Sequence, residues 1–221
     1  MKNNILVITA HPDDEVLGVG GTILKHISSG DNVSILILSD GETSRDSGAD
    51  INKRERQAKE VSRLLGVSNL IMEKLPDNQF DSIPLLKIIK IIENTVNKLN
   101  PSIIYTHHAH DLNIDHRLTF QAVLTVCRPQ PKFSVKKILT FETPSSTEWQ
   151  MKTYAFCPTE YNDIAKFLPK KIDILKIYED ELREYPHPRS LESIKILAQY
   201  RGLEVGYHFA EAFQIIRTLN D

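Results

Sequence analysis

Imidazole and carboxylate side chains crowd one short stretch near the start of the chain. Residues 11–15 read His-Pro-Asp-Asp-Glu and directly follow the apolar run at residues 5–8. Burying such polar groups costs free energy unless a cation or a network of protons stabilises them. Pro12 favours an extended conformation at His11, so the imidazole can project from a strand end while the carboxylates begin a helix. The stretch predicts a cation site, with a simple helix cap as the alternative.

A second group of ligand-type side chains lies about a hundred residues further on. Four of the chain's eight histidines fall between His107 and His116, just past the apolar run at residues 101–106. Histidine is the commonest metal ligand in proteins. The carboxyl ends of neighbouring parallel strands meet in one crevice. The two stretches can therefore converge on a single divalent cation if their strands are neighbours.

Apolar runs alternate with helical patterns along the chain and predict the elements that hold these side chains. Helices are expected at residues 16–28, 53–65, 83–99, 115–126, 190–201 and, in large part, 163–184; strands are expected at 4–9, 33–38, 69–72, 101–106 and 138–141. This alternation predicts an α/β fold, a three-layer Rossmann-like sandwich with a mainly parallel sheet. A polar loop is expected at 44–51, over the crevice.

Three early glycines, Gly18, Gly20 and Gly21, need separate consideration because they resemble a dinucleotide fingerprint. That fingerprint belongs in the turn between a strand and a helix, whereas these glycines fall inside the predicted helix. Close packing of the helix on the sheet therefore explains them better than a nucleotide site.

The composition narrows the class of protein. A length of 221 residues suits one domain, residues 1–221, with a substantial core. The net charge of −2 provides no basic excess for nucleic acid or anionic lipid. No apolar run approaches 18 residues and no signal peptide is evident, so we expect no membrane insertion and a cytoplasmic location. The sequence leaves the oligomeric state open, a homo-oligomer included.

Two motifs together resemble those of the PIG-L/LmbE-type zinc-dependent N-deacetylases. They are the stretch at residues 11–15 and the stretch at 111–117, which reads Asp-Leu-Asn-Ile-Asp-His-Arg. Looser matches follow at residues 39–42, 186–190 and 210–213. The resemblance covers nearly the whole chain and implies a single PIG-L/LmbE-like deacetylase domain.

The resemblance also implies a ligand set and a base. His11, Asp14 and His116 would bind Zn²⁺, although Fe²⁺ or another divalent ion suits the same set. Asp13 would then be a carboxylate outside the ligand set, able to act as the general base toward water. Asp115 adjoins His116 and is expected to orient an imidazole, either that of its neighbour or another.

One position departs from the family pattern. Many relatives have a histidine three residues before the last zinc ligand, where this chain has Asn113. An amide N–H can donate to an oxyanion but cannot supply a proton. We therefore expect either Asn113 or His110 to stabilise the oxyanion, with a structural turn as the alternative for Asn113. His107 and His108 are expected in the core or at the rim, outside the ligand set.

Two arginines are candidate substrate contacts. The resemblance suggests this role for Arg54, with a solvated arginine as the alternative. Arg189 lies in a proline-flanked loop and could hold a polar or anionic part of the substrate by a bidentate contact. The alternative for Arg189 is an ion pair that shapes the loop.

The expected activity is that of a zinc-dependent hydrolase that removes an N-acetyl or other N-acyl group from a small-molecule amino sugar or sugar conjugate. The sugar follows from the resemblance alone. A different metal-dependent hydrolase, such as a phosphoesterase, would need a second metal and more bridging carboxylates. A non-catalytic nucleotide or nucleotide-sugar binding protein would have no use for a free base at Asp13.

Overall fold

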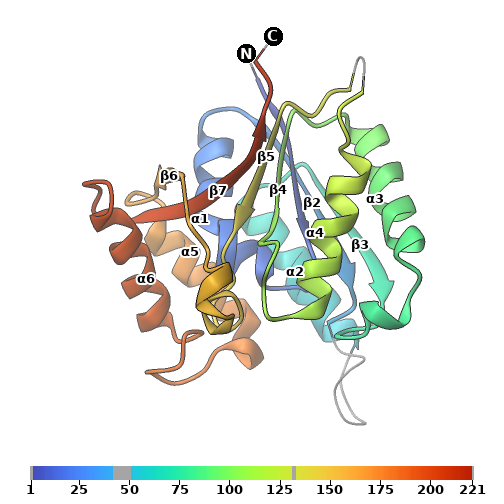
Figure 1. The fold of residues 1–221 in the computed structure, drawn as a ribbon. Helices are drawn as coiled ribbons and strands as arrows, with labels where there is room; N and C mark the ends of the chain where they lie inside the picture. The colour runs from blue at the N-terminus through green and yellow to red at the C-terminus, as the bar shows by residue number, and fades with distance from the viewer. Residues whose placement is uncertain (1, 42–50, 131–132, 221) are drawn as a thin grey trace.

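Seven strands of the computed structural model form one twisted sheet in the order β3-β2-β1-β4-β5-β7-β6 (Figure 1). The structure describes residues 2–41, 51–130 and 133–220. The strands are β1 (Asn4–Thr9), β2 (Asn32–Ser39), β3 (Asn69–Leu75), β4 (Ile103–His107), β5 (Lys137–Phe141), β6 (Glu160–Asp163) and β7 (Ala210–Thr218). The first five strands are parallel, and β7 runs antiparallel to both β5 and β6.

Helices cover both faces of the sheet, as Figure 1 shows. They are α1 (Asp14–Ser28), α2 (Ile51–Leu65), α3 (Leu85–Leu99), α4 (Ile114–Val126), α5 (Leu168–Leu175) and α6 (Leu191–Leu203). Ile5 and Val7 face a core shared with α1, α2 and α5, whereas Leu6 and Ile8 face a core shared with α3 and α4. This alternation follows from the two-residue period of a strand. The predicted three-layer sandwich with a mainly parallel sheet is confirmed.

Strands β6 and β7 fall at residues for which the sequence predicted no strand. Residues 163–184 are largely helical, as predicted, but the helical part begins at Leu168 and consists of α5 and the 3-10 helix η4 (Lys176–Glu181). Neither β6 nor β7 contains the continuous apolar run of a buried parallel strand. The predicted loop at 44–51 falls, except for Ile51, outside the described residues. No helix of the described chain is long and apolar enough to cross a membrane.

The glycines of α1 allow the helix to lie very close to its neighbours. A Cβ atom at Gly18 would lie 2.2 Å from Cδ2 of Phe141 on β5, and one at Gly21 would lie 2.8 Å from Cγ2 of Ile164. Both distances are far below van der Waals contact, so any larger side chain would push the helix off the sheet. Close helix–sheet packing therefore explains Gly18, as predicted, whereas Gly21 packs against Ile164, which follows β6.

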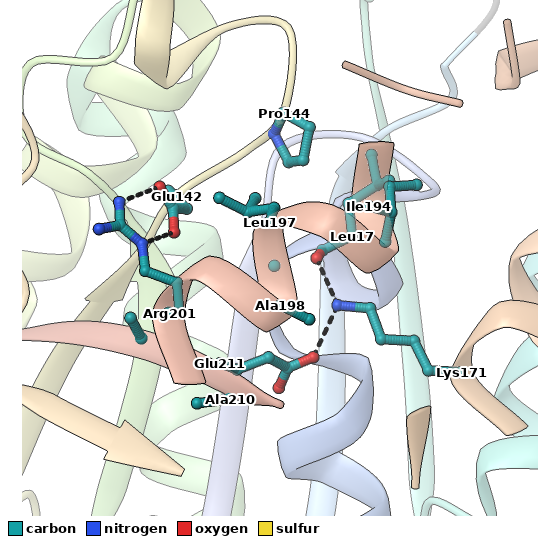
Figure 2. A pocket seen from close by; sticks show the side chains of 12 residues that line it. Leu17, Glu142, Pro144, Lys171, Ile194, Leu197, Ala198, Arg201, Ala210 and Glu211 are labelled. Atoms are coloured by element: carbon teal, nitrogen blue, oxygen red, sulfur yellow. Dashed lines mark hydrogen bonds and ion pairs between the residues drawn. The ribbon is translucent and has the colours of Figure 1, made fainter. Parts of the chain in front are cut away.

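A buried ion pair also holds α1 in place (Figure 2). Lys171 of α5 donates to the Glu211 carboxylate of β7 at 2.7 Å and to the Leu17 carbonyl of α1 at 2.8 Å. Glu211 also accepts the backbone N–H groups of Gly21 and Thr22 at 2.8 and 2.7 Å. These contacts satisfy both buried charges. They give the Ala-Glu-Ala-Phe motif at 210–213 a structural role, which is to hold the helix that begins with Asp14.

The order of the strands places a crevice at the carboxyl ends of β1 and β4. β1 lies between β2 and β4 and pairs in parallel with both. The chain leaves β1 through α1 toward β2, and β4 lies on the other side, so this is the point where the strand order reverses. Open α/β sheets bind ligands at such a point. β1 and β4 are therefore neighbours, which is the condition for the two polar stretches to converge.

Candidate metal centre

Three candidate ligands from the two crevice strands converge on one point. His11 follows β1, Asp14 is the first residue of α1 and His116 lies in the first turn of α4. His11 Nδ1 lies 3.3 Å from Asp14 Oδ2 and 3.2 Å from His116 Nε2, and the last two atoms are 3.4 Å apart. Asp14 and His116 are buried, and His11 is 13% exposed.

The donor atoms of this triad fit a divalent cation. Ligands about 2.0–2.1 Å from a tetrahedral zinc ion lie about 3.3 Å from one another, which matches the three separations. Asp14 Oδ1 is buried and receives no hydrogen bond from any described residue. A buried carboxylate oxygen without a donor costs free energy that a cation would remove. Two imidazoles and a carboxylate form a donor set that zinc accepts readily.

A second group of potential ligands shares His11 with the first. It comprises His11, Asp77 and Asp115, and it uses the other ring nitrogen, Nε2. His11 Nε2 lies 3.1 Å from Asp115 Oδ2 and 3.3 Å from Asp77 Oδ1. A neutral imidazole offers one lone pair, so His11 cannot serve both groups at once. If Nδ1 faces a metal, Nε2 carries the proton and donates it to the carboxylates.

Two carboxylates orient the two imidazoles, in a crossed arrangement. Asp115 faces His11, and its other oxygen accepts the backbone N–H of Phe80 at 3.0 Å. The ring of His116 instead contacts Asp111, whose Oδ1 lies 3.1 Å from His116 Nδ1. Of the two alternatives for Asp115, the contact with His11 agrees with the one in which it orients an imidazole other than that of His116. On a helix, adjacent residues point in different directions, so Asp115 and His116 cannot face each other.

His107 supports the triad from within the core. Its ring stacks on the ring of His116 with centroids 3.8 Å apart. His107 Nε2 accepts the backbone N–H of Ala10 at 2.9 Å, which ties the end of β4 to the end of β1. Burial lowers the pKa of His107 to about 3, so the ring is neutral. The expected place of His107, in the core outside the ligand set, agrees with these contacts.

The electrostatics of the triad favour a positive charge at its centre. Burial opposes protonation of His11, but the hydrogen bonds that its ring donates to the Asp115 and Asp14 carboxylates outweigh burial and raise its pKa to about 10. Burial likewise opposes protonation of His116, and the nearby Asp14 and Asp111 carboxylates raise its pKa to about 9. Carboxylates that hold protons on two buried imidazoles create a potential that also attracts a metal cation.

Asp13 stands beside the triad but outside it. It is buried, lines a cavity of about 80 Å³ and has an unusual backbone conformation with φ of 118°. Positive φ is strained for a residue with a Cβ and persists only where the surroundings enforce it. Burial raises the pKa of Asp13, while the nearby Arg189 guanidinium opposes that rise. A raised pKa in a cavity is typical of a carboxyl group that exchanges protons.

Glu15 and Tyr178 enforce this backbone conformation. Glu15 Oε2 accepts the backbone N–H of Asp13 at 3.0 Å, and Glu15 Oε1 accepts the Tyr178 hydroxyl at 2.7 Å. All three side chains are buried. The sequence offered Glu15 as part of its motif, but nothing in the pattern pointed to Tyr178 of η4.

Tyr178→Phe is expected to misplace Asp13, the predicted general base, through Glu15. We therefore expect kcat to fall by about tenfold or more, since small misplacements of a catalytic group are costly. The lost hydrogen bond would also reduce the free energy of unfolding by about 1 kcal/mol, too little to unfold the chain. Metal content should not change. Tyr207→Phe, at an exposed tyrosine, is the control. A kcat equal to that of the wild type would show that Glu15 holds Asp13 without Tyr178.

The two candidate arginines differ in position. Arg189 lines the cavity and donates to Asp13 Oδ2 at 2.9 Å and to Glu181 Oε2 at 3.1 Å. Arg54 is only 1% exposed, forms an ion pair with Glu181 and is not among the described residues that line this cavity. The structure thus brings Arg189 to the cavity. Arg54 instead pairs with Glu181, which lines the cavity. A role in substrate contact stays a prediction for both arginines.

The two candidate oxyanion donors, Asn113 and His110, also lie in different surroundings. Asn113 lines the cavity and caps α4, since its Oδ1 accepts the backbone N–H of Asp115 at 2.8 Å. Its Nδ2 donates to Asn78 Oδ1 at 2.9 Å. His110 is exposed, and its ring stacks on Tyr154 with centroids 4.5 Å apart. The structure therefore does not bring His110 to the cavity, because the loop after β4 directs its ring outward.

Comparisons with known proteins agree with this arrangement. The family described as PIG-L, GlcNAc-PI de-N-acetylase, matches residues 6–127, more than half of the chain. Diacetylchitobiose deacetylase of Thermococcus kodakarensis is 24% identical over 225 residues, covering 96% of this chain and 82% of that protein. A Bacillus anthracis protein named "Probable N-acetyl-alpha-D-glucosaminyl L-malate deacetylase 2" is 24% identical over 192 residues, covering 82% and 83%.

A solved structure shows the same fold. N,N'-diacetylchitobiose deacetylase from Pyrococcus horikoshii superposes with a TM-score of 0.80 at 20% identity, covering 97% of this chain and 84% of that one. The matched family segment runs from β1 through α4 and so includes every residue of the triad together with Asp13. The chain therefore belongs to the PIG-L family of deacetylases.

Proposed function

We propose that this chain is a zinc-dependent hydrolase that removes an N-acetyl or other N-acyl group from an amino sugar or sugar conjugate. The observation that carries the proposal is the convergence of His11, Asp14 and His116 beside Asp13, a buried carboxylate outside the triad. The named relatives act on N-acetylated sugars, which supports the substrate class.

The triad would hold the metal. A bound divalent cation polarises a carbonyl and lowers the pKa of water, which is the chemistry that amide hydrolysis needs. Asp111 and Asp115 would fix the ring orientations of His116 and His11. His107, neutral and stacked on His116, would keep that face of the triad dry.

Asp13 would move the protons. As general base it would accept a proton from water, and it would then give that proton to the leaving amine. Arg189 donates to Asp13 Oδ2, which aims the carboxylate and moderates its pKa. Of the two predicted oxyanion donors, the geometry favours Asn113, because its amide lines the cavity. Its Nδ2 would exchange the contact with Asn78 for one with the substrate.

The rival activities fit the site less well. A two-metal phosphoesterase needs two ions about 3.5–4 Å apart with bridging ligands. The two groups of potential ligands among the described residues share His11, whose single lone pair serves only one of them. A pure binding protein would gain nothing from holding Asp13 in a strained conformation next to the triad.

The test is a release assay on the purified, zinc-loaded chain. A panel of N-acetylated sugars and conjugates would be incubated with it, and free amine and acetate would be measured separately. We expect both products in a one-to-one ratio for at least one amino sugar, with loss of both after chelation. Release of phosphate from phosphoesters, without release of any amine, would contradict the proposal.

A further inference from the structure

A second cavity adjoins the candidate site and differs from it in size and character. It measures about 400 Å³, against about 80 Å³ for the cavity at Asp13. A cavity of about 150 Å³ holds one benzene ring, so the smaller cavity accommodates only part of a sugar conjugate. We call the larger cavity the apolar groove; its lining includes Pro144, Tyr185, Pro188, Ile196 and Tyr200.

The apolar groove shares a wall with the candidate site. Pro188 and Pro144 line the groove, and Arg189, the residue that follows Pro188, lines the cavity at Asp13. Arg189 Nε donates to Ser145 Oγ at 2.7 Å, while its Nη1 donates to Asp13. A substrate with its amide at Asp13 can therefore extend past Arg189 into the groove.

The opposite wall is a stripe of α6. Ser193, Ile196 and Tyr200 recur at helical spacing and face the groove. Ile196 is 48% exposed and Tyr200 is 54% exposed, and across the groove Tyr185 is 58% exposed. Large apolar side chains gathered in one exposed concave surface mark a binding site more often than isolated ones do.

The charges of the groove select against anions. Its lining contains two carboxylates, Glu142 and Glu148, and no basic residue among the described lining residues. Glu142 forms a bidentate pair with Arg201, which neutralises it. Among the residues that the structure describes, Glu148 accepts the backbone N–H groups of Ser145 and Ser146 and pairs with no cation, so it leaves a net negative charge. A phosphate or carboxylate would be repelled there.

We propose that the apolar groove receives an uncharged, apolar substituent of the N-acylated amino sugar. This proposal rests on the deacetylase function proposed above. It narrows the substrate class, because conjugates with an anionic group at that position are disfavoured. The amide enters the small polar cavity at Asp13, and the substituent lies between α6 and the segment at 185–188.

The test compares three N-acetylglucosamine derivatives that differ only at the anomeric position: the methyl glycoside, the octyl glycoside and the 1-phosphate. We expect kcat/KM for the octyl glycoside to exceed that for the methyl glycoside by about tenfold or more. The gain should come from a lower KM, because several methylenes become buried. The 1-phosphate should be a poorer substrate than the methyl glycoside.

Two matched variants locate the effect. Ile196→Asp places a charge in the groove and should abolish the octyl advantage while leaving the methyl glycoside within about twofold. Leu86→Asp, at a 62% exposed leucine on α3, is the control and should keep the octyl advantage. Light scattering would measure the molecular mass of Ile196→Asp in solution. A mass different from that of the wild type would indicate that a second copy of the chain occupies the groove, and would overturn the proposal.

The outcomes separate the two proposals. Amine release from the methyl glycoside without any gain for the octyl glycoside would overturn the assignment of the groove alone. An octyl advantage that survives in Ile196→Asp would overturn that assignment as well. Absence of amine release from every N-acylated amino sugar tried would overturn the proposed function, and the assignment of the groove would fall with it.

Discussion

Asp13→Asn is expected to lower kcat for deacetylation by about 10²–10⁴-fold while the metal stays bound, since this is the usual contribution of a positioned general base. The substitution is isosteric, and an asparagine oxygen can still accept from Arg189. Asp13 lies outside the triad, so the three donor atoms keep their 3.2–3.4 Å separations. KM should change little, because ground-state contacts remain.

The measurement pairs steady-state kinetics with metal analysis of the same preparation. Asp81→Asn, at an exposed aspartate next to Phe80, is the control and should match the wild type. Loss of metal together with loss of activity in Asp13→Asn would make Asp13 a ligand. Retention of wild-type kcat would remove Asp13 from the mechanism.

His116→Gln is expected to abolish both metal binding and activity. Glutamine keeps much of the volume but removes the imidazole nitrogen that lies 3.2 Å from His11 Nδ1. Removing a partner that only orients a ligand typically weakens metal affinity by about 10–100-fold, and removing a ligand costs more. Asp111→Asn changes a carboxylate that contacts the triad at His116, so its metal affinity should fall between those of the wild type and His116→Gln.

His110→Ala is the matched control for this experiment. His110 comes from the same segment after β4, but its ring is exposed and stacks on Tyr154. We expect metal content and kcat within about twofold of the wild type, since the variant removes only an exposed ring contact. A large fall in kcat for His110→Ala would return this residue to the oxyanion role that the sequence suggested.

The sheet and the two crevice stretches could be predicted because they obey local rules. Buried parallel strands such as β1 and β2 are continuous apolar runs, and each ends in polar residues at the same edge of the sheet. Strands β6 and β7 carry no such run, and their place depends on the tertiary pairing of β7 with β5 and of β6 with β7. Propensity alone cannot indicate that pairing.

Partners within the site could be predicted only in part. The motif contained Asp111 and Asp115, but which carboxylate serves which imidazole depends on the direction of side chains around the first turn of α4. Tyr178 and Glu181 lie more than 160 residues after Asp13 and belong to η4, where no pattern marks them. Only the folded chain brings them to the site.

The most direct test of the account is to locate the metal in crystals of the zinc-loaded protein by anomalous scattering. We expect one strong peak between His11 Nδ1, Asp14 and His116 Nε2, with Asp13 outside the coordination sphere. A peak instead between His11 Nε2, Asp77 and Asp115, or no peak near His11 at all, would contradict it.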